Sequence, residues 1–166
     1  MKKIAFLAIV LMIVACNQDK ETRGIPGPEE VAPAARDTVI SVEDRVEELK
    51  RQGYQTFFYE EGDTTYLMQQ YYIVFLKSGK KRSQDSTEAA ELQKQHLAHL
   101  SRMADEGYLS LVGPFGDDGN IRGIAIYNTP NQKMADSLVN LDPMVKAGRL
   151  EVEIHPWWAA KGGKLQ

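Results

Sequence analysis

Two of the chain's three histidines lie three residues apart in the segment QKQHLAHLSRM, residues 93–103. Histidine titrates near neutral pH, so it can exchange protons with a bound molecule, and it can also ligate a metal ion. The spacing of apolar residues predicts a helix over 86–106. On that helix His96 falls at the centre of the apolar face, whereas His99 falls at its edge.

His96 has two interpretations. It is either a core histidine whose ring nitrogens are satisfied by hydrogen bonds, or a buried general base that faces a pocket. A metal site built on His96 and His99 is less well supported, because no third ligand is evident and Glu91 lies on the opposite side of the helix. We therefore expect no metal.

Four polar side chains outside this helix could also line a pocket. Asp117 and Asp118 belong to the turn GDDGN, where aspartate usually forms the turn itself, although it could rim a site. Arg122 and His155 lie on predicted strands, where they are exposed or line a cleft between sheets. A fifth residue, Asp142, precedes a proline at a helical start, and an aspartate N-cap there contributes about 1 kcal/mol.

The elements that must position these residues follow from the hydrophobic pattern. Strands are predicted over 69–77, 108–115, 121–128 and 149–158, and helices over 86–106 and 130–141. Ser86 and Thr129 are the expected N-caps of the two helices. The order strand, helix, strand, strand, helix, strand predicts an α+β, ferredoxin-like fold with two helices on one face of an antiparallel sheet.

The first of these strands is apolar on both faces. Tyr71, Ile73 and Phe75 alternate with equally apolar neighbours, so both faces should be covered. The two helices can cover only one face. A second subunit's sheet would cover the other and make a homodimer, although a hairpin predicted to turn at 62–63 could cover it instead. Trp157 and Trp158 are expected in packing or dimer contacts.

The N-terminus reads as a processing signal. Residues 1–15 combine two lysines with a short apolar run, and Ile13-Val14-Ala15-Cys16 resembles the lipobox of bacterial lipoproteins. This resemblance implies cleavage before Cys16, lipid attachment there, and anchoring in the bacterial cell envelope. Asn17 favours the outer membrane by resemblance to enterobacterial sorting signals. Residues 16–40, rich in proline and charge, are expected to form a flexible stalk.

Composition excludes several classes of site. The single cysteine is used by the lipobox, so a mature domain would have neither a disulfide nor a cysteine nucleophile. The formal net charge is −3 and no basic stripe is present, so nucleic acid is not an expected partner. No phosphate-binding glycine loop or Gly-x-Ser-x-Gly motif occurs, and no organic cofactor is expected.

A longer set of motifs resembles one family. His-Leu-x-x-Leu from His96, Glu-Gly before a strand, Gly-Pro after it, Asp-Pro-x-Val-x-Ala-Gly from Asp142 and a Pro-Trp ending occur in order over residues 69–158. This pattern resembles the YCII-related domain family. The resemblance implies a ferredoxin-like fold that dimerises as an α+β barrel. Residues 41–68, a helix and a hairpin, and the tail 159–166 lie outside the pattern.

The resemblance also implies a function. The family's characteristic histidine and aspartate fall on His96 and Asp142, which would then act as an acid/base residue and its orienting partner. An arginine often precedes the last proline in the family, whereas this chain has His155. The expected activity is lyase- or isomerase-like chemistry on an unknown small molecule. The alternative is a lipoprotein that keeps the fold but only binds a ligand or an envelope partner.

Overall fold

The computed structural model describes residues 40–165, which belong to one compact unit. The expected signal peptide, Cys16 and the stalk up to residue 39 lie outside the described residues. The boundary expected between residues 68 and 69 falls inside a continuous strand. None of the described helices is both long and apolar enough to cross a membrane.

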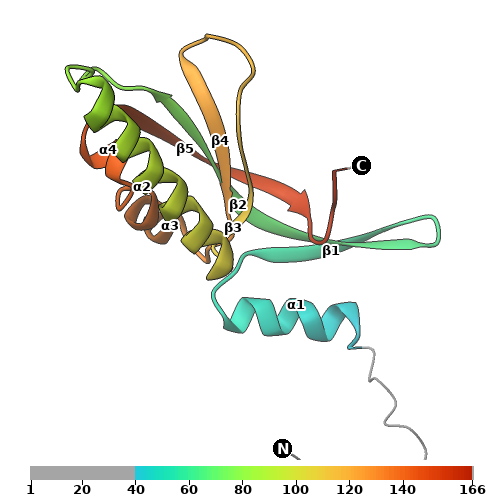
Figure 1. The fold of residues 1–166 in the computed structure, drawn as a ribbon. Helices are drawn as coiled ribbons and strands as arrows, with labels where there is room; N and C mark the ends of the chain where they lie inside the picture. Colours follow the sequence, from blue (N-terminus) through green and yellow to red (C-terminus); the bar gives the residue numbers. More distant parts are fainter. Residues whose placement is uncertain (1–39, 166) are drawn as a thin grey trace, which may run out of the picture. The chain divides into compact units, whose positions relative to one another are not determined.

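A five-stranded antiparallel sheet forms the centre of the fold, and four of its strands make up the predicted core arrangement (Figure 1). The long strand β2 (Thr64–Ser78) pairs with β5 (Leu150–Ala160) along one edge and with β4 (Ile121–Tyr127) along the other. Strand β3 (Leu109–Pro114) completes the sheet beside β4. The order β5-β2-β4-β3 is that of a ferredoxin-like fold, so the predicted α+β class is confirmed.

The segment that precedes this sheet extends it. Strand β1 (Thr56–Glu61) turns at Gly62, whose φ of 58° suits glycine, and pairs with the first part of β2. Helix α1 (Val42–Arg51) packs against β1. Because β1 joins an edge of β2, the hairpin projects from the sheet and does not lie across its second face (Figure 1).

Three helices lie together on one face of the sheet (Figure 1). Helix α2 (Ser86–Asp105) packs along α4 (Pro143–Lys146) and β3, and helix α3 (Gln132–Val139) lies against β5. The prediction that Ser86 caps α2 was wrong by one residue. Asp85 caps α2, because its carboxylate accepts two backbone N–H groups of the first turn, both at 2.9 Å.

The start of α3 also differs from the prediction. Asn131, and not Thr129, caps this helix, because its side chain accepts the backbone N–H of Met134 at 2.9 Å. Thr129 is buried, and its hydroxyl donates to the Asn131 carbonyl. The helix is therefore shorter than the span 130–141 that apolar spacing predicted.

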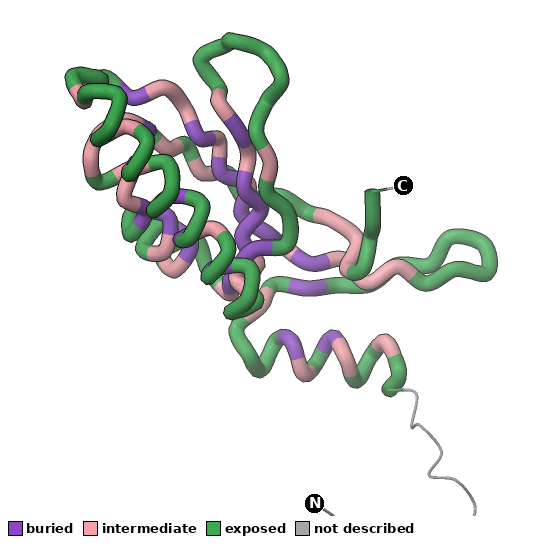
Figure 2. Tube along the Cα trace, viewed as in Figure 1, coloured by how far each residue is buried: buried purple, intermediate pink, exposed green. Residues whose placement is uncertain are grey.

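The main core lies between the sheet and the three helices. Alternate residues of β2, namely Tyr72, Val74 and Leu76, meet Met103 of α2 and Val139 of α3 there. Buried positions accordingly gather along the sheet and on the helix surfaces that face it (Figure 2). The opposite sheet face is only partly buried: its apolar members are Tyr71, Ile73, Phe75, Leu111, Ile124, Ile126 and Trp157.

Candidate functional site

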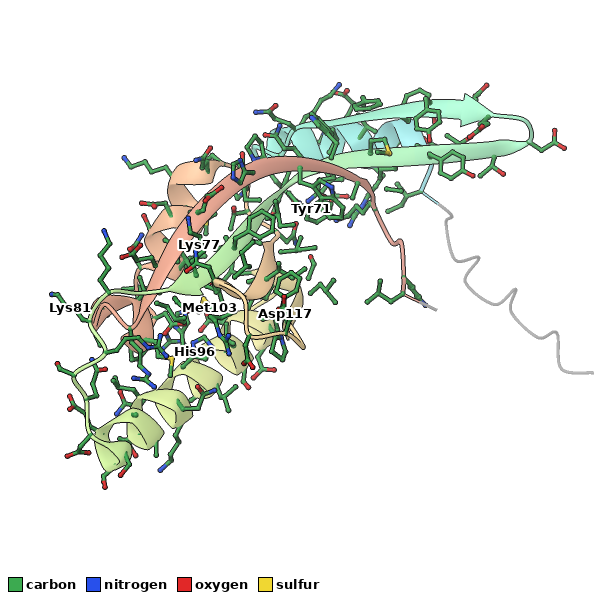
Figure 3. The ribbon with its side chains drawn as sticks, turned by 90° about the horizontal axis from the view of Figure 1, so that it is seen from above. Tyr71, Lys77, Lys81, His96, Met103 and Asp117 are labelled. Carbon is green, nitrogen blue, oxygen red and sulfur yellow. The ribbon has the colours of Figure 1, made fainter. Side chains whose placement is uncertain are left out.

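His96 and Asp142 meet in the layer between α2 and the sheet. The Nδ1 atom of His96 lies 2.6 Å from Oδ2 of Asp142, and both side chains are buried. His96 lies on the side of α2 that faces the sheet (Figure 3). An ionised carboxylate accepts hydrogen bonds, so this contact favours a proton on Nδ1 and leaves Nε2 as the nitrogen available to a bound molecule.

Asp142 is fixed by local structure. It caps α4, and its Oδ1 accepts the backbone N–H of Met144 at 2.8 Å. Proline at the next position suits the first turn of a helix, because its missing N–H would have had no partner there. One carboxylate therefore begins a helix with one oxygen and holds an imidazole with the other, so the two interpretations of Asp142 do not exclude each other.

A cavity of about 670 Å³ opens beside His96. Its volume falls in the range of about 300–1,000 Å³ that is typical of small-molecule sites. Helix α2 contributes His96 and one long wall, and the other lining residues come from β2, β3, β4, α4, the start of β5 and the loops that adjoin β2 and β5. The lining side chains are mainly apolar or small: Leu76, Ala89, Ala90, Leu97, Leu100, Val112, Pro114, Met144 and Leu150.

Arginines are the charged residues that line this cavity: Arg82, Arg122 and Arg149. Of these, only Arg122 was predicted from the sequence as a pocket residue; Arg82 and Arg149 were not. Arg82 follows β2 and Arg149 precedes β5, and antiparallel pairing of these strands brings the two arginines to the same end of the sheet. That pairing is the signal that could have identified them.

The other predicted pocket residues lie elsewhere. Asp117, on the β3–β4 loop (Figure 3), does not line the cavity, and the exposed Asp118 lies 3.9 Å from Arg122. His155 lies on the second face of the sheet, paired with Ile73, and its Nε2 is 2.8 Å from Glu153. It therefore points away from the His96 cavity.

His99 is more deeply buried than its place on the helical wheel suggests. Its exposed fraction is 4%, against 8% for His96, and its Nδ1 accepts a hydrogen bond from Arg102 at 3.1 Å. Burial lowers the pKa of His99, and the nearby cations Arg102 and Lys146 lower it further, against the opposite effect of Asp142. A neutral His99 that accepts at Nδ1 carries its proton on Nε2.

Two buried polar atoms lack a hydrogen-bond partner among the described residues: His99 Nε2 and the hydroxyl of Tyr127. Burial raises the pKa of Tyr127, and the negative charge of Asp142 raises it further. The charge of Asp142 thus raises the pKa of Tyr127 and opposes the lowering of the pKa of His99, while its Oδ2 contacts His96. Within residues 40–165 no cluster of three or more His, Cys, Asp or Glu could hold a metal ion.

Comparison with known proteins identifies a family and similar solved structures. The sequence profile of the YCII-related domain matches residues 71–158, more than half of the chain. A 5-chloro-2-hydroxyhydroquinone dehydrochlorinase from Burkholderia phenoliruptrix, solved with 2,5-dihydroxybenzoquinone, is 21% identical with a TM-score of 0.40. The alignment covers 52% of this chain and 92% of that one. No curated protein matches the chain.

Proposed function

The chain belongs to the YCII-related domain family, and we propose that it is an acid/base enzyme acting on a small molecule in the His96 cavity. The observation that carries this proposal is the 2.6 Å contact between His96 Nδ1 and Asp142 Oδ2 at the wall of that cavity. A histidine that lines a pocket and is held at one ring nitrogen by a buried carboxylate is an arrangement suited to proton transfer.

In this mechanism His96 moves a proton at Nε2. The neutral imidazole accepts a proton from a carbon or oxygen atom of the substrate, and Asp142 stabilises the resulting imidazolium through Nδ1–H. In an isomerisation the same nitrogen returns the proton to another carbon as the double bond shifts; in an elimination it protonates the leaving group as the bond between that group and carbon breaks. The apolar lining limits water around the transferred proton.

The test is a reaction screen with a matched pair of variants. The full chain is incubated with small hydroxy acids, keto acids, lactones and phenols, and products are identified by mass spectrometry. His96→Gln should abolish conversion while leaving the urea unfolding midpoint close to that of the wild type, and His155→Gln should convert normally. Equal loss of stability and of conversion in His96→Gln would favour a core histidine, and thermal stabilisation by a compound that is never converted would favour a ligand-binding protein.

The proposal extends to location. The lipobox ending at Cys16 supports an exported protein that is lipid-anchored in the cell envelope, and Asn17 supports the outer membrane. Metabolic labelling with a clickable fatty acid should mark the wild-type chain and leave Cys16→Ser unlabelled. Equal labelling of both would contradict lipidation at Cys16.

We also propose that the second sheet face is covered by the sheet of another copy of the chain, in a homodimer. The support is the apolar face itself, where Leu111 and Trp157 remain 37% and 43% exposed. Phe75→Lys places a charge on this face and should convert a dimer to a monomer in analytical ultracentrifugation. Tyr59→Lys, exposed and on the other face of the β1–β2 hairpin, is the control and should leave the mass unchanged. A monomeric wild type would contradict the proposal.

A further inference from the structure

We propose that the His96 cavity selects an anionic ligand, a carboxylate on an apolar body, and that Arg82 and Arg149 bind its charged group. This inference rests on the proposed function, since it assigns a substrate class to the same site. It starts from the charge of the lining. The cavity is lined by three arginines and by no aspartate or glutamate of the described residues.

The two arginines are not neutralised by neighbouring acids. The ion pairs formed among the described residues include neither Arg82 nor Arg149, whereas Arg122 has Asp118 at 3.9 Å. Arg149 is half-buried, and one of its N–H groups donates to the side-chain oxygen of Gln84 at 3.2 Å. A guanidinium has five N–H donors in a planar fork, so both side chains keep donors for a carboxylate.

Backbone bonds hold the two arginines at one end of the cavity. The N–H of Gly79 donates to the Arg149 carbonyl at 2.9 Å, and the N–H of Lys81 donates to the Gly148 carbonyl at 3.1 Å. The Arg82 side chain reaches the same Arg149 carbonyl at 3.4 Å. The loop after β2 is thereby fixed to the start of β5, which holds the exposed Arg82 beside the half-buried Arg149.

The rest of the cavity defines the remainder of the ligand. Small side chains at Ala89 and Ala90 leave space along α2, and the remaining walls are mainly aliphatic. An apolar body would bury surface there, while His96 reaches the same space from α2. A carboxylate bound by arginines would also orient the neighbouring carbon atoms, at which His96 could exchange a proton.

The inference is tested by calorimetric titration of the purified full chain with acetate, benzoate and 2-naphthoate. Each acid is compared with its primary amide, titrated in the same way. At least one acid should bind about tenfold or more tightly than its amide, because charge-assisted bonds to arginine are lost in the amide. Arg82→Gln and Arg149→Gln should each weaken that acid by about tenfold and leave the amide unchanged. Arg51→Gln makes the same chemical change on α1, outside the cavity, and should have no effect.

Several results would overturn the inference. These are amides that bind as tightly as the acids, no acid that binds, or an equal loss of binding in Arg51→Gln and Arg149→Gln. Arg149→Lys, which keeps the charge, should retain binding better than Arg149→Gln, and this comparison separates recognition from misfolding. If the wild type and His96→Gln both bind the acid but the wild type converts no compound, the proposed function would be refuted while this inference stands. If neutral substrates are converted, and at the same rate by the wild type, Arg82→Gln and Arg149→Gln, this inference would be refuted while the proposed function stands.

Discussion

The Nδ1 atom of His96 lies 2.6 Å from Oδ2 of Asp142, although the two residues are 46 positions apart in the chain. The contact joins the middle of α2 to the residue that caps α4. Because both side chains are buried, loss of either one would leave the other without its partner in a medium of low polarity. Truncation of either side chain should therefore cost stability, whereas a substitution that can keep the hydrogen bond, such as His96→Gln or Asp142→Asn, isolates the effect on proton transfer.

Asp142→Asn should keep the helix cap and lose the chemistry. Its amide oxygen can still accept the N–H of Met144, whereas its amide nitrogen would donate to His96 Nδ1 and leave the ring proton on Nε2. We expect conversion to fall about hundredfold or more. Asp142→Ala should be less stable than Asp142→Asn by about 1 kcal/mol, because it also loses the cap. Urea unfolding and rate measurements check both values, and equal stability of the two variants would contradict the double role.

His99 should make stability depend on pH. Its pKa in the folded chain lies below the ordinary value of 6.5, so the unfolded chain binds more protons once the pH falls below about 6.5. The free energy of unfolding is therefore highest above about pH 6.5 and decreases as the pH falls towards the lowered pKa. His99→Gln should remove this contribution, and its unfolding free energy should decline less between about pH 7.5 and about pH 5 than that of the wild type. A slope unchanged from the wild type would contradict the burial argument.

Tyr127→Phe should be neutral or stabilising by about 1 kcal/mol, because the buried hydroxyl has no partner among the described residues. Tyr72→Phe is the matched control, since the Tyr72 hydroxyl donates to Gln70 at 3.2 Å. That control should cost about 1 kcal/mol. Thermal unfolding of both variants provides the comparison. Destabilisation of Tyr127→Phe by as much as Tyr72→Phe would show that the Tyr127 hydroxyl does have a partner in solution.

Gly79→Ala should destabilise the arginine end of the cavity. A Cβ at this position would lie 2.2 Å from the Gly148 carbonyl oxygen, so the backbone of the loop or of β5 must move. We expect a loss of about 2 kcal/mol or more, together with weaker binding of carboxylates. Gly116→Ala, where a Cβ meets nothing within 4 Å, should change neither property. Urea unfolding and calorimetry measure the two effects. If Gly79→Ala changed neither the stability nor the binding of carboxylates, this junction would not be rigid.

The sequence was sufficient for the order of the elements, because each strand and helix carries its own hydrophobic period and its own end signals. Gly107 and Gly148, with φ of 79° and 68°, follow helices at the positions where glycine predicts a helix end. The caps were harder to predict. Near the start of α3, Thr129 and Asn131 are both capping residues by type, and only burial of the threonine decides between them.

The site was predictable only in part. His96 could be chosen because helical periodicity places it on the apolar axis of α2. The burial of His99 depends on packing outside α2 itself, and a helical wheel contains no information about that packing. Arg82 and Arg149 are 67 residues apart, and they became neighbours only through the pairing of β2 with β5.

Solvent deuterium exchange tests the central claim most directly, because it detects proton abstraction without knowledge of the product. The full chain is placed in D₂O with a panel of 2-oxo acids and 3-oxo acids, and loss of carbon-bound proton signals is followed by NMR. We expect the wild type to exchange at least one compound faster than buffer does, and His96→Gln to fall to the buffer rate while remaining folded. No exchange by the wild type, or equal exchange by His96→Gln, would contradict acid/base chemistry at His96.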